Sequence, residues 1–170
     1  MLRKNIIILL SVAILGFCLG FFIRMGIESN KFILATWDVD PVLIVCPDSQ
    51  ITPYRVAKAV EWWGIRGHEF AYYHFDSDNT ICGKGTFIKG VVFIRAEGEL
   101  LPDSYAITAR LALAGKMQAA SITLPNKHKY MPRLLEHELG HALGFTHIEK
   151  RGHMMHPIHE HGGEKFYIPD

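Results

Sequence analysis

The stretch His137 to His147, "HELGHALGFTH", decides the fold of this 170-residue chain, and it holds three of the ten histidines. Residues four apart on an α-helix lie on the same face, so His137 and His141 present their rings to one point in space. Leu135 and Leu139 lie on the other side of the same helical wheel. The stretch therefore predicts a helix with a buried back and a face that bears two histidines.

The end of the stretch supplies a third histidine. Gly144 tolerates the left-handed backbone conformation that ends a helix abruptly, so the chain can turn back and bring His147 to the other two rings. Three neutral nitrogens leave the fourth tetrahedral position of a zinc ion open to water, as in catalytic zinc sites. A helix that is rich in histidine by chance and a structural zinc site are the alternative interpretations.

Glu138 favours the catalytic interpretation. It follows the first expected ligand directly and can accept a proton from a water molecule at the metal. Zinc lowers the pKa of bound water to about 7 in favourable sites, so a carboxylate of ordinary basicity suffices as general base. The frame H-E-x-x-H-x-x-G-x-x-H is complete here, and it is far more specific than H-E-x-x-H alone.

The stretch "HELGHALGFTH", followed by "GHMMHP" at residues 152–157, resembles the metzincin metallopeptidases and, within them, the matrixins (matrix metalloproteinase type). The resemblance implies one catalytic Zn²⁺ held by His137, His141 and His147, with Glu138 as the catalytic base. It also implies that Met155 is the Met-turn residue beneath the metal. The implied fold is a twisted, mostly parallel sheet with one antiparallel edge strand.

Two residues depart from the family pattern: His156 stands where a tyrosine is usual, and Ile148 where a serine is usual. The resemblance further implies a polypeptide substrate. We expect it to lie in extended form along a sheet edge near Ile107 to Leu113, held by the region Tyr105 to Leu124. The residues that bind individual substrate side chains are not readable from the sequence.

The order of patterns along the chain predicts an α+β domain over residues 41–170, in which helices back a mixed sheet. The resemblance implies that this is a metzincin-like (zincin) domain with a twisted mixed sheet, a backing helix and the active-site helix. "PVLIVCP" is a short apolar run bounded by prolines, typical of a buried strand. Thr52 and Pro53 provide an N-cap and a first-turn proline for the backing helix. Further strands are expected in "HEFAYYHF", in "GVVFIRA", and in two segments between residues 105 and 124.

The amino-terminal region predicts a membrane segment. Ile6 to Ile23 runs 18 residues without a charge and follows Arg3 and Lys4. The run is long enough to span a bilayer, which favours an uncleaved signal anchor over residues 1–24, with residues 25–40 as a tether. The positive flank predicts a cytoplasmic amino terminus and an extracytoplasmic peptidase domain. The alternative is secretion after signal cleavage.

Composition adds three expectations. A formal net charge of +1 gives no field that would attract nucleic acid, so no nucleic-acid partner is expected. Cys46 and Cys82 are equally compatible with a disulfide and with two buried thiols. A structural calcium or a second zinc, near His74 and Asp76 or in the histidine-rich tail, has no complete ligand set to support it.

The sequence leaves two functions to be distinguished. The first is a zinc-dependent metalloendopeptidase that uses an activated water molecule and a glutamate base. The second is a zinc-stabilised peptide-binding module that turns over weakly or not at all. The presence of Glu138 favours the enzyme.

Overall fold

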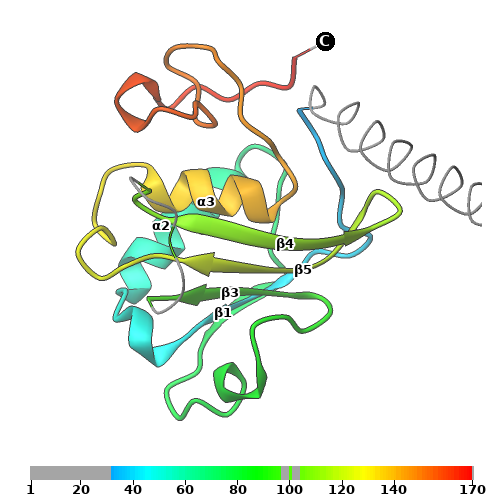
Figure 1. Ribbon diagram of the computed structural model, residues 1–170, viewed down its shortest axis with the longest axis vertical. Coiled ribbons are helices and arrows are strands. Elements are labelled where there is room, and N and C mark those ends of the chain that lie inside the picture. Colours follow the sequence, from blue (N-terminus) through cyan, green and yellow to red (C-terminus); the bar gives the residue numbers. More distant parts are fainter. Residues whose placement is uncertain (1–31, 97–99, 101–103, 170) are drawn as a thin grey trace, which may run out of the picture. The chain divides into compact units, whose positions relative to one another are not determined.

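The computed structural model describes residues 32–96, 100 and 104–169, which fold around one five-stranded sheet (Figure 1). The spatial strand order is β2-β1-β3-β5-β4. The strands are β1 (Val42–Val45), β2 (Tyr72–Phe75), β3 (Val91–Arg95), β4 (Ile107–Leu113) and β5 (Lys116–Thr123), and the α-helices are α2 (Pro53–Gly64) and α3 (Leu134–Ala142). Short 3₁₀ turns are η1 (Pro47–Ser49), η2 (Cys82–Lys84) and η3 (His159–His161).

The sheet is mixed, as the sequence predicted. Strands β1, β2, β3 and β5 are parallel, and β4 pairs antiparallel with β5 at one edge. A tight turn joins β4 to β5, where Ala114 and Gly115 both have positive φ. This turn reverses the chain between β4 and β5, and β4, the edge strand, passes beside α3 (Figure 1). The prediction of an α+β fold with a backing helix and a histidine-bearing helix is confirmed.

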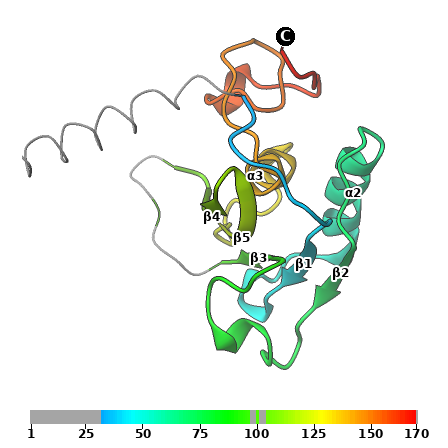
Figure 2. The same ribbon diagram turned by 90° about the vertical axis from the view of Figure 1, so that its right-hand side faces the viewer.

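The two faces of the sheet are covered differently (Figure 2). Alternate residues of a strand point to opposite faces, so Leu43 and Val45 join the core beneath both helices, whereas Ile44 faces the other way. That second face is covered by the loop after β2. Burial of the larger core beneath both helices supplies most of the stabilisation, because apolar burial contributes about 25 cal/mol per Å².

The loop after β2 is fixed by a disulfide and by one buried carboxylate. Cys46 and Cys82 form a disulfide, with Cα atoms 5.8 Å apart, which resolves the two alternatives that the sequence left open. Asp76 is 1% exposed and accepts hydrogen bonds from the backbone N–H groups of Ile81 (2.9 Å) and Cys82 (2.6 Å). Burial raises the pKa of the Asp76 carboxyl, but these hydrogen bonds outweigh burial and hold it below the usual 3.8.

Replacing Asp76 should therefore destabilise the domain. Asp76→Ala leaves two buried N–H groups unpaired, and we expect a lower Tm at neutral pH in a thermal melt followed by circular dichroism. A carboxylate with a depressed pKa stabilises the fold above its unfolded-state pKa and loses that effect as pH falls through its folded-state value. The difference in Tm should therefore shrink below about pH 4. Asp78→Ala is the control, since Asp78 is exposed and accepts from the exposed Thr80 hydroxyl rather than from buried backbone N–H groups.

The predicted membrane localisation is corrected by the structure. Among residues 32–96, 100 and 104–169, no helix is both long enough and apolar enough to cross a bilayer. The segment Ile6 to Ile23, on which the expectation of a signal anchor rested, lies outside the described residues.

Candidate metal centre

Helix α3 is held in one orientation by two contacts with α2. The indole N–H of Trp63 donates to the backbone carbonyl of Glu136 over 2.8 Å. The Arg55 guanidinium makes a bidentate pair with the Glu136 carboxylate, with both N···O distances at 2.6 Å. Because both contacts hold the first turn of α3, the helix cannot rotate about its axis, and its histidine-bearing face stays turned toward β4.

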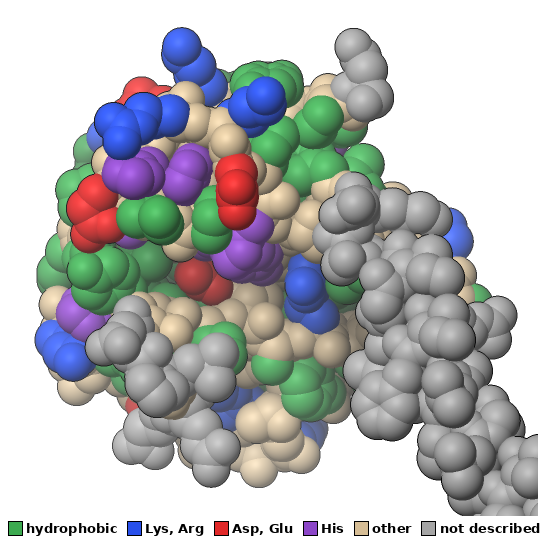
Figure 3. All heavy atoms as spheres, turned by 45° about the horizontal axis from the view of Figure 1, so that its top comes forward, with side chains coloured by type: hydrophobic (Ala, Val, Ile, Leu, Met, Phe, Trp, Pro, Cys, Tyr) green, Lys and Arg blue, Asp and Glu red, His purple; other side chains and the backbone are tan. Residues whose placement is uncertain are grey.

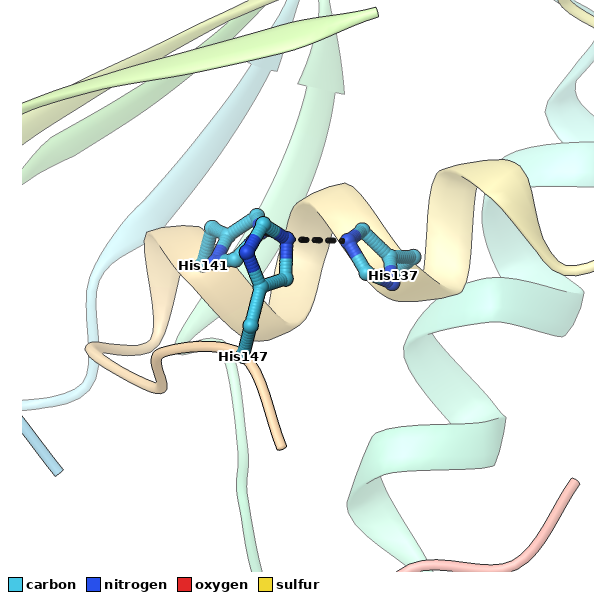
Figure 4. Close-up of side chains that lie close together, drawn as sticks. All are labelled: His137, His141 and His147. Atoms are coloured by element: carbon cyan, nitrogen blue, oxygen red, sulfur yellow. Dashed lines mark hydrogen bonds between the residues drawn. The ribbon is translucent and has the colours of Figure 1, made fainter. Parts of the chain in front are cut away.

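The structure brings the three predicted histidines together (Figure 4). His137 and His141 extend from successive turns of α3, and His147 approaches from the loop after the helix. The Nε2 atom of His147 lies 3.3 Å from Nε2 of His137 and 3.1 Å from Nε2 of His141. Tetrahedral zinc with Zn–N bonds of about 2.0–2.1 Å requires ligand nitrogens about 3.3 Å apart, so the cluster has the dimensions that zinc needs.

The second nitrogens of two rings fix which nitrogen carries the proton. Nδ1 of His137 lies 2.8 Å from the Met154 carbonyl oxygen, and Nδ1 of His141 lies 2.9 Å from the Phe145 carbonyl oxygen. A carbonyl only accepts, so both Nδ1 atoms are donors and both Nε2 atoms carry lone pairs. Nε2 of His147 faces both of these lone pairs. It carries at most one proton, so it can donate a hydrogen bond to only one of them. A cation satisfies all three nitrogens at once, which makes the donor set fit a metal ion.

The surroundings also keep the imidazoles neutral. Burial lowers the pKa of His137 to about 4 and that of His141 well below its usual value. Partial burial, followed by the positive charge of Arg110, lowers the pKa of His147. Metal ligation requires neutral rings, so the site is suited to bind a cation at neutral pH without first releasing protons.

Glu138 lies on the same helix, directly beside this cluster, and is 5% exposed. The Thr108 hydroxyl, from β4, donates to Glu138 Oε2 over 2.5 Å. Burial raises the pKa of the Glu138 carboxyl to about 7, opposed by the hydrogen bond from Thr108 and by the charge of Arg110. The carboxylate is therefore oriented by the edge strand and has the basicity to exchange protons near neutral pH.

Met155 lies under α3 with no exposed surface. A Cβ atom placed on Gly140 would lie 2.4 Å from Met155 Sδ and 2.7 Å from Trp63 Cζ2, so α3 has no room for a side chain at this position. Gly140 is thus where α3 packs directly on the methionine and on α2. This contact sets the depth of the helix, and hence the height of His137 and His141 above the core.

The packing at Gly140 can be tested by adding one methyl group. Gly140→Ala gains up to about 1 kcal/mol of helix propensity but overpacks a rigid contact, which typically costs about 1–3 kcal/mol. We expect a net loss of unfolding free energy in urea melts. Gly64→Ala is the matched control, because no heavy atom lies within 4 Å of its Cβ position, and it should be neutral or stabilising. Equal stabilities for the two variants would contradict the proposed packing.

A cleft of about 570 Å³ opens beside the three histidines. Its walls come from β4 and the residues just before it, from α3, and from the segment after Met155. Figure 3 shows histidine side chains gathered on this side of the molecule, with acidic and basic side chains beside them. One wall is formed by His156, which departs from the family pattern, and by the four residues that follow it, Pro157 to Glu160.

Two residues at this site were missed by the sequence analysis. Thr108 contacts Glu138 directly, and the Arg110 guanidinium donates to the Phe145 carbonyl oxygen over 3.0 Å and lines the cleft. Both lie on β4, which the sequence identified only as an edge for substrate. No local pattern marks them, because they reach α3 only through the order of strands in the sheet.

The other metal-site candidates do not form ligand clusters. Among the described residues, the one group of three or more His, Cys, Asp or Glu side chains that could hold an ion is His137, His141 and His147. His74 is exposed on β2, and the Asp76 carboxylate is occupied by backbone N–H groups. His156 is 8% exposed, and its Nδ1 accepts from the Ile158 N–H.

The fold and the histidine cluster have the features of a metallopeptidase of the zinc-dependent type. A family model described as Matrixin matches residues 58–170, more than half of the chain, so the chain belongs to the matrixin family. This match confirms the resemblance seen in the sequence. No curated protein and no solved structure gives a significant match.

Proposed function

We propose that this matrixin is a zinc-dependent metalloendopeptidase that hydrolyses peptide bonds with an activated water molecule. The observation that carries the proposal is the convergence of three neutral Nε2 atoms next to a buried carboxylate. The Nε2 atom of His147 lies 3.3 Å from that of His137 and 3.1 Å from that of His141. His137, His141 and His147 would hold the ion. Zinc, when bound, supplies Lewis acidity that polarises the scissile carbonyl and acidifies a water molecule.

Glu138 would serve as the general base. The Thr108 hydroxyl engages Oε2, which leaves Oε1 to accept a proton from the attacking water. The same carboxyl then returns a proton to the nitrogen of the departing amine. Its burial in the cleft wall keeps bulk water from competing for that proton and strengthens its electrostatic effect on the reacting atoms.

The substrate is proposed to be an extended polypeptide that pairs with the free edge of β4. Strand β4 pairs only with β5 among the described strands, so its other edge offers backbone N–H and C=O groups to a peptide. The cleft runs along this edge from Ser104 to Arg110 and past the three histidines. A peptide laid there would bring its scissile carbonyl to the metal position.

Met155 is proposed to be the Met-turn residue. Met155 is completely buried under Gly140 of α3. Gly140 lies between the two helical histidines in the sequence. The neighbouring Met154 carbonyl fixes the His137 ring. A methionine at this place supports the ligands from below without competing for the metal, because a thioether is a weak ligand for zinc compared with imidazole.

The proposal is tested by Glu138→Gln, which keeps the shape of the side chain but removes its basicity. We expect the variant to bind about one zinc per chain, yet to lose on the order of 10²- to 10⁴-fold in cleavage of casein, the usual contribution of a positioned base. His141→Ala, the comparison variant, should lose both zinc and cleavage. Metal content is measured by atomic absorption and cleavage by release of labelled peptides, with and without a chelator.

Each alternative gives a different result in the same experiment. If Glu138→Gln cleaves casein as fast as the parent, the carboxylate does not transfer protons and the proposed mechanism is wrong. If the parent binds zinc but cleaves neither casein nor a peptide library, the result favours a zinc-stabilised peptide-binding module. If the parent binds no zinc, both functions are contradicted.

The role of Thr108 can be tested separately. Thr108→Val removes the hydroxyl that donates to Glu138 but keeps the branched shape, and Thr108→Ser restores the hydroxyl. A hydrogen bond to a charged group contributes about 1.5–3 kcal/mol, so we expect roughly 10-fold or more loss of kcat in the valine variant and recovery in the serine variant. Zinc content should be equal in all three proteins. Equal kcat values would show that Thr108 does not position the base.

A further inference from the structure

Residues 32–37, here called the N-terminal strap, lie against the carboxyl end of α3 and form part of the compact unit Phe32–Asp170 (Figures 1 and 2). The sequence analysis placed these residues in a tether. In the structure they are held from two sides. On one side Thr36 exchanges backbone hydrogen bonds with the β4–β5 turn, donating to Gly115 O (3.1 Å) and accepting from Met117 N (2.9 Å).

On its other side the strap pairs with the loop that connects the second and third histidines. Ile33 and Phe145 form an antiparallel bridge. The Leu34 N–H donates to Gly144 O over 2.9 Å, and the Thr146 N–H donates to Phe32 O over 2.7 Å. These two bonds flank Phe145, so both neighbours of that residue are fixed to the strap.

Two further contacts fix the last turn of α3. The indole N–H of Trp37 donates to the Ala142 carbonyl over 2.9 Å and so satisfies one of the helix-terminal carbonyls, which have no partner within the helix. Gly144 has φ +107°, and a Cβ atom there would lie 1.9 Å from the Ala35 carbonyl oxygen. The strap therefore approaches this loop so closely that only glycine fits.

Phe145 lies between the two residues that are hydrogen-bonded to the strap, and its own carbonyl is directed toward the metal site. Phe145 O accepts from His141 Nδ1 over 2.9 Å and from Arg110 over 3.0 Å. That carbonyl sets the orientation of the His141 ring and keeps its Nε2 unprotonated. His147 follows two residues later, so the same short loop also sets where the third ring stands.

We infer that the N-terminal strap is a positioning element of the metal centre, which raises its affinity for zinc by fixing the 143–146 loop. The inference rests on the proposed function for the identity of the metal. An unsupported loop must be ordered when the ion binds, and that entropic cost lowers affinity. The strap orders the loop beforehand, so that His141 and His147 already stand at ligand distance.

The test compares two tryptophan-to-phenylalanine substitutions in the full chain. Trp37→Phe removes the hydrogen bond to Ala142 but keeps an aromatic ring. Trp62→Phe is the matched control: its ring packs against Arg66 (3.6 Å), Trp63 (4.9 Å) and Phe166 (6.2 Å), and phenylalanine keeps an aromatic ring in these contacts. Zinc affinity is measured by competition with a chromophoric chelator. Removing a group bonded directly to a metal ligand typically lowers affinity by about 10- to 100-fold, and Trp37 acts one step further out, so we expect a loss of about 3- to 10-fold for Trp37→Phe alone.

A second pair of variants tests the backbone of the strap. Leu34→Pro removes the N–H that donates to Gly144, and Val39→Pro makes the same change at an exposed position beyond the strap. Zinc affinity should fall for Leu34→Pro and remain at the parent value for Val39→Pro. If Leu34→Pro does not fold, the tryptophan pair decides the question.

The remaining measurements separate positioning from simple stability. At saturating Co²⁺, the visible d–d absorption of Trp37→Phe should differ from that of the parent, whereas that of Trp62→Phe should not. Excess zinc should restore full metal content to Trp37→Phe. Parent-like zinc affinity and parent-like cobalt spectra in folded Trp37→Phe would overturn the inference but leave the proposed function intact. A parent that binds no zinc would overturn the proposed function itself.

Discussion

Three imidazole nitrogens must be held together, with His147 Nε2 3.3 Å from that of His137 and 3.1 Å from that of His141, and this constraint governs the rest of the structure. Without a cation the arrangement is unfavourable, since at most one proton can be shared among neighbouring acceptors. The fold has to supply the restraint. It does so by giving the second nitrogens of His137 and His141 a carbonyl each, from Met154 and Phe145.

Those two carbonyls are themselves fixed by apolar packing around Trp63. Met154 precedes the buried Met155, which lies against the helix at Gly140 together with Trp63. Phe145 stacks on Trp63 with ring centroids 5.4 Å apart and on Phe32 at 5.3 Å. One aromatic cluster therefore connects the strap, α2 and the loop between the histidines. Precision at the metal centre depends on this apolar packing as much as on polar contacts.

The edge strand has a separate role, which is electrostatic. Burying Glu138 raises the pKa of its carboxyl, and both groups that oppose this rise, Thr108 and Arg110, come from β4. Arg110 also lowers the pKa of His147, so one guanidinium favours a charged base and neutral ligands together. The strand proposed to receive the peptide is thus the strand that adjusts the chemistry of the cleft, and substrate pairing along β4 would act directly on both groups.

The sequence by itself determined the parts of the site that depend on short-range geometry. Helical spacing places His137 and His141 on one face, and Gly144 allows the turn that returns His147. The start of α2 was equally local: the Thr52 side chain accepts from the Arg55 N–H, and Pro53 occupies the first turn. Each of these features depends on residues at most six positions apart, for which backbone geometry leaves few alternatives.

Only the tertiary structure decided what surrounds that site. Thr108 reaches Glu138 across 30 positions of the sequence, and Trp37 reaches Ala142 across 105. The pairing of Cys46 with Cys82 depends on the loop after β2 folding over the second face of the sheet. Such contacts depend on strand order and on which helix face meets which strand. These are set by burial of the whole core, so no short stretch of the sequence contains them.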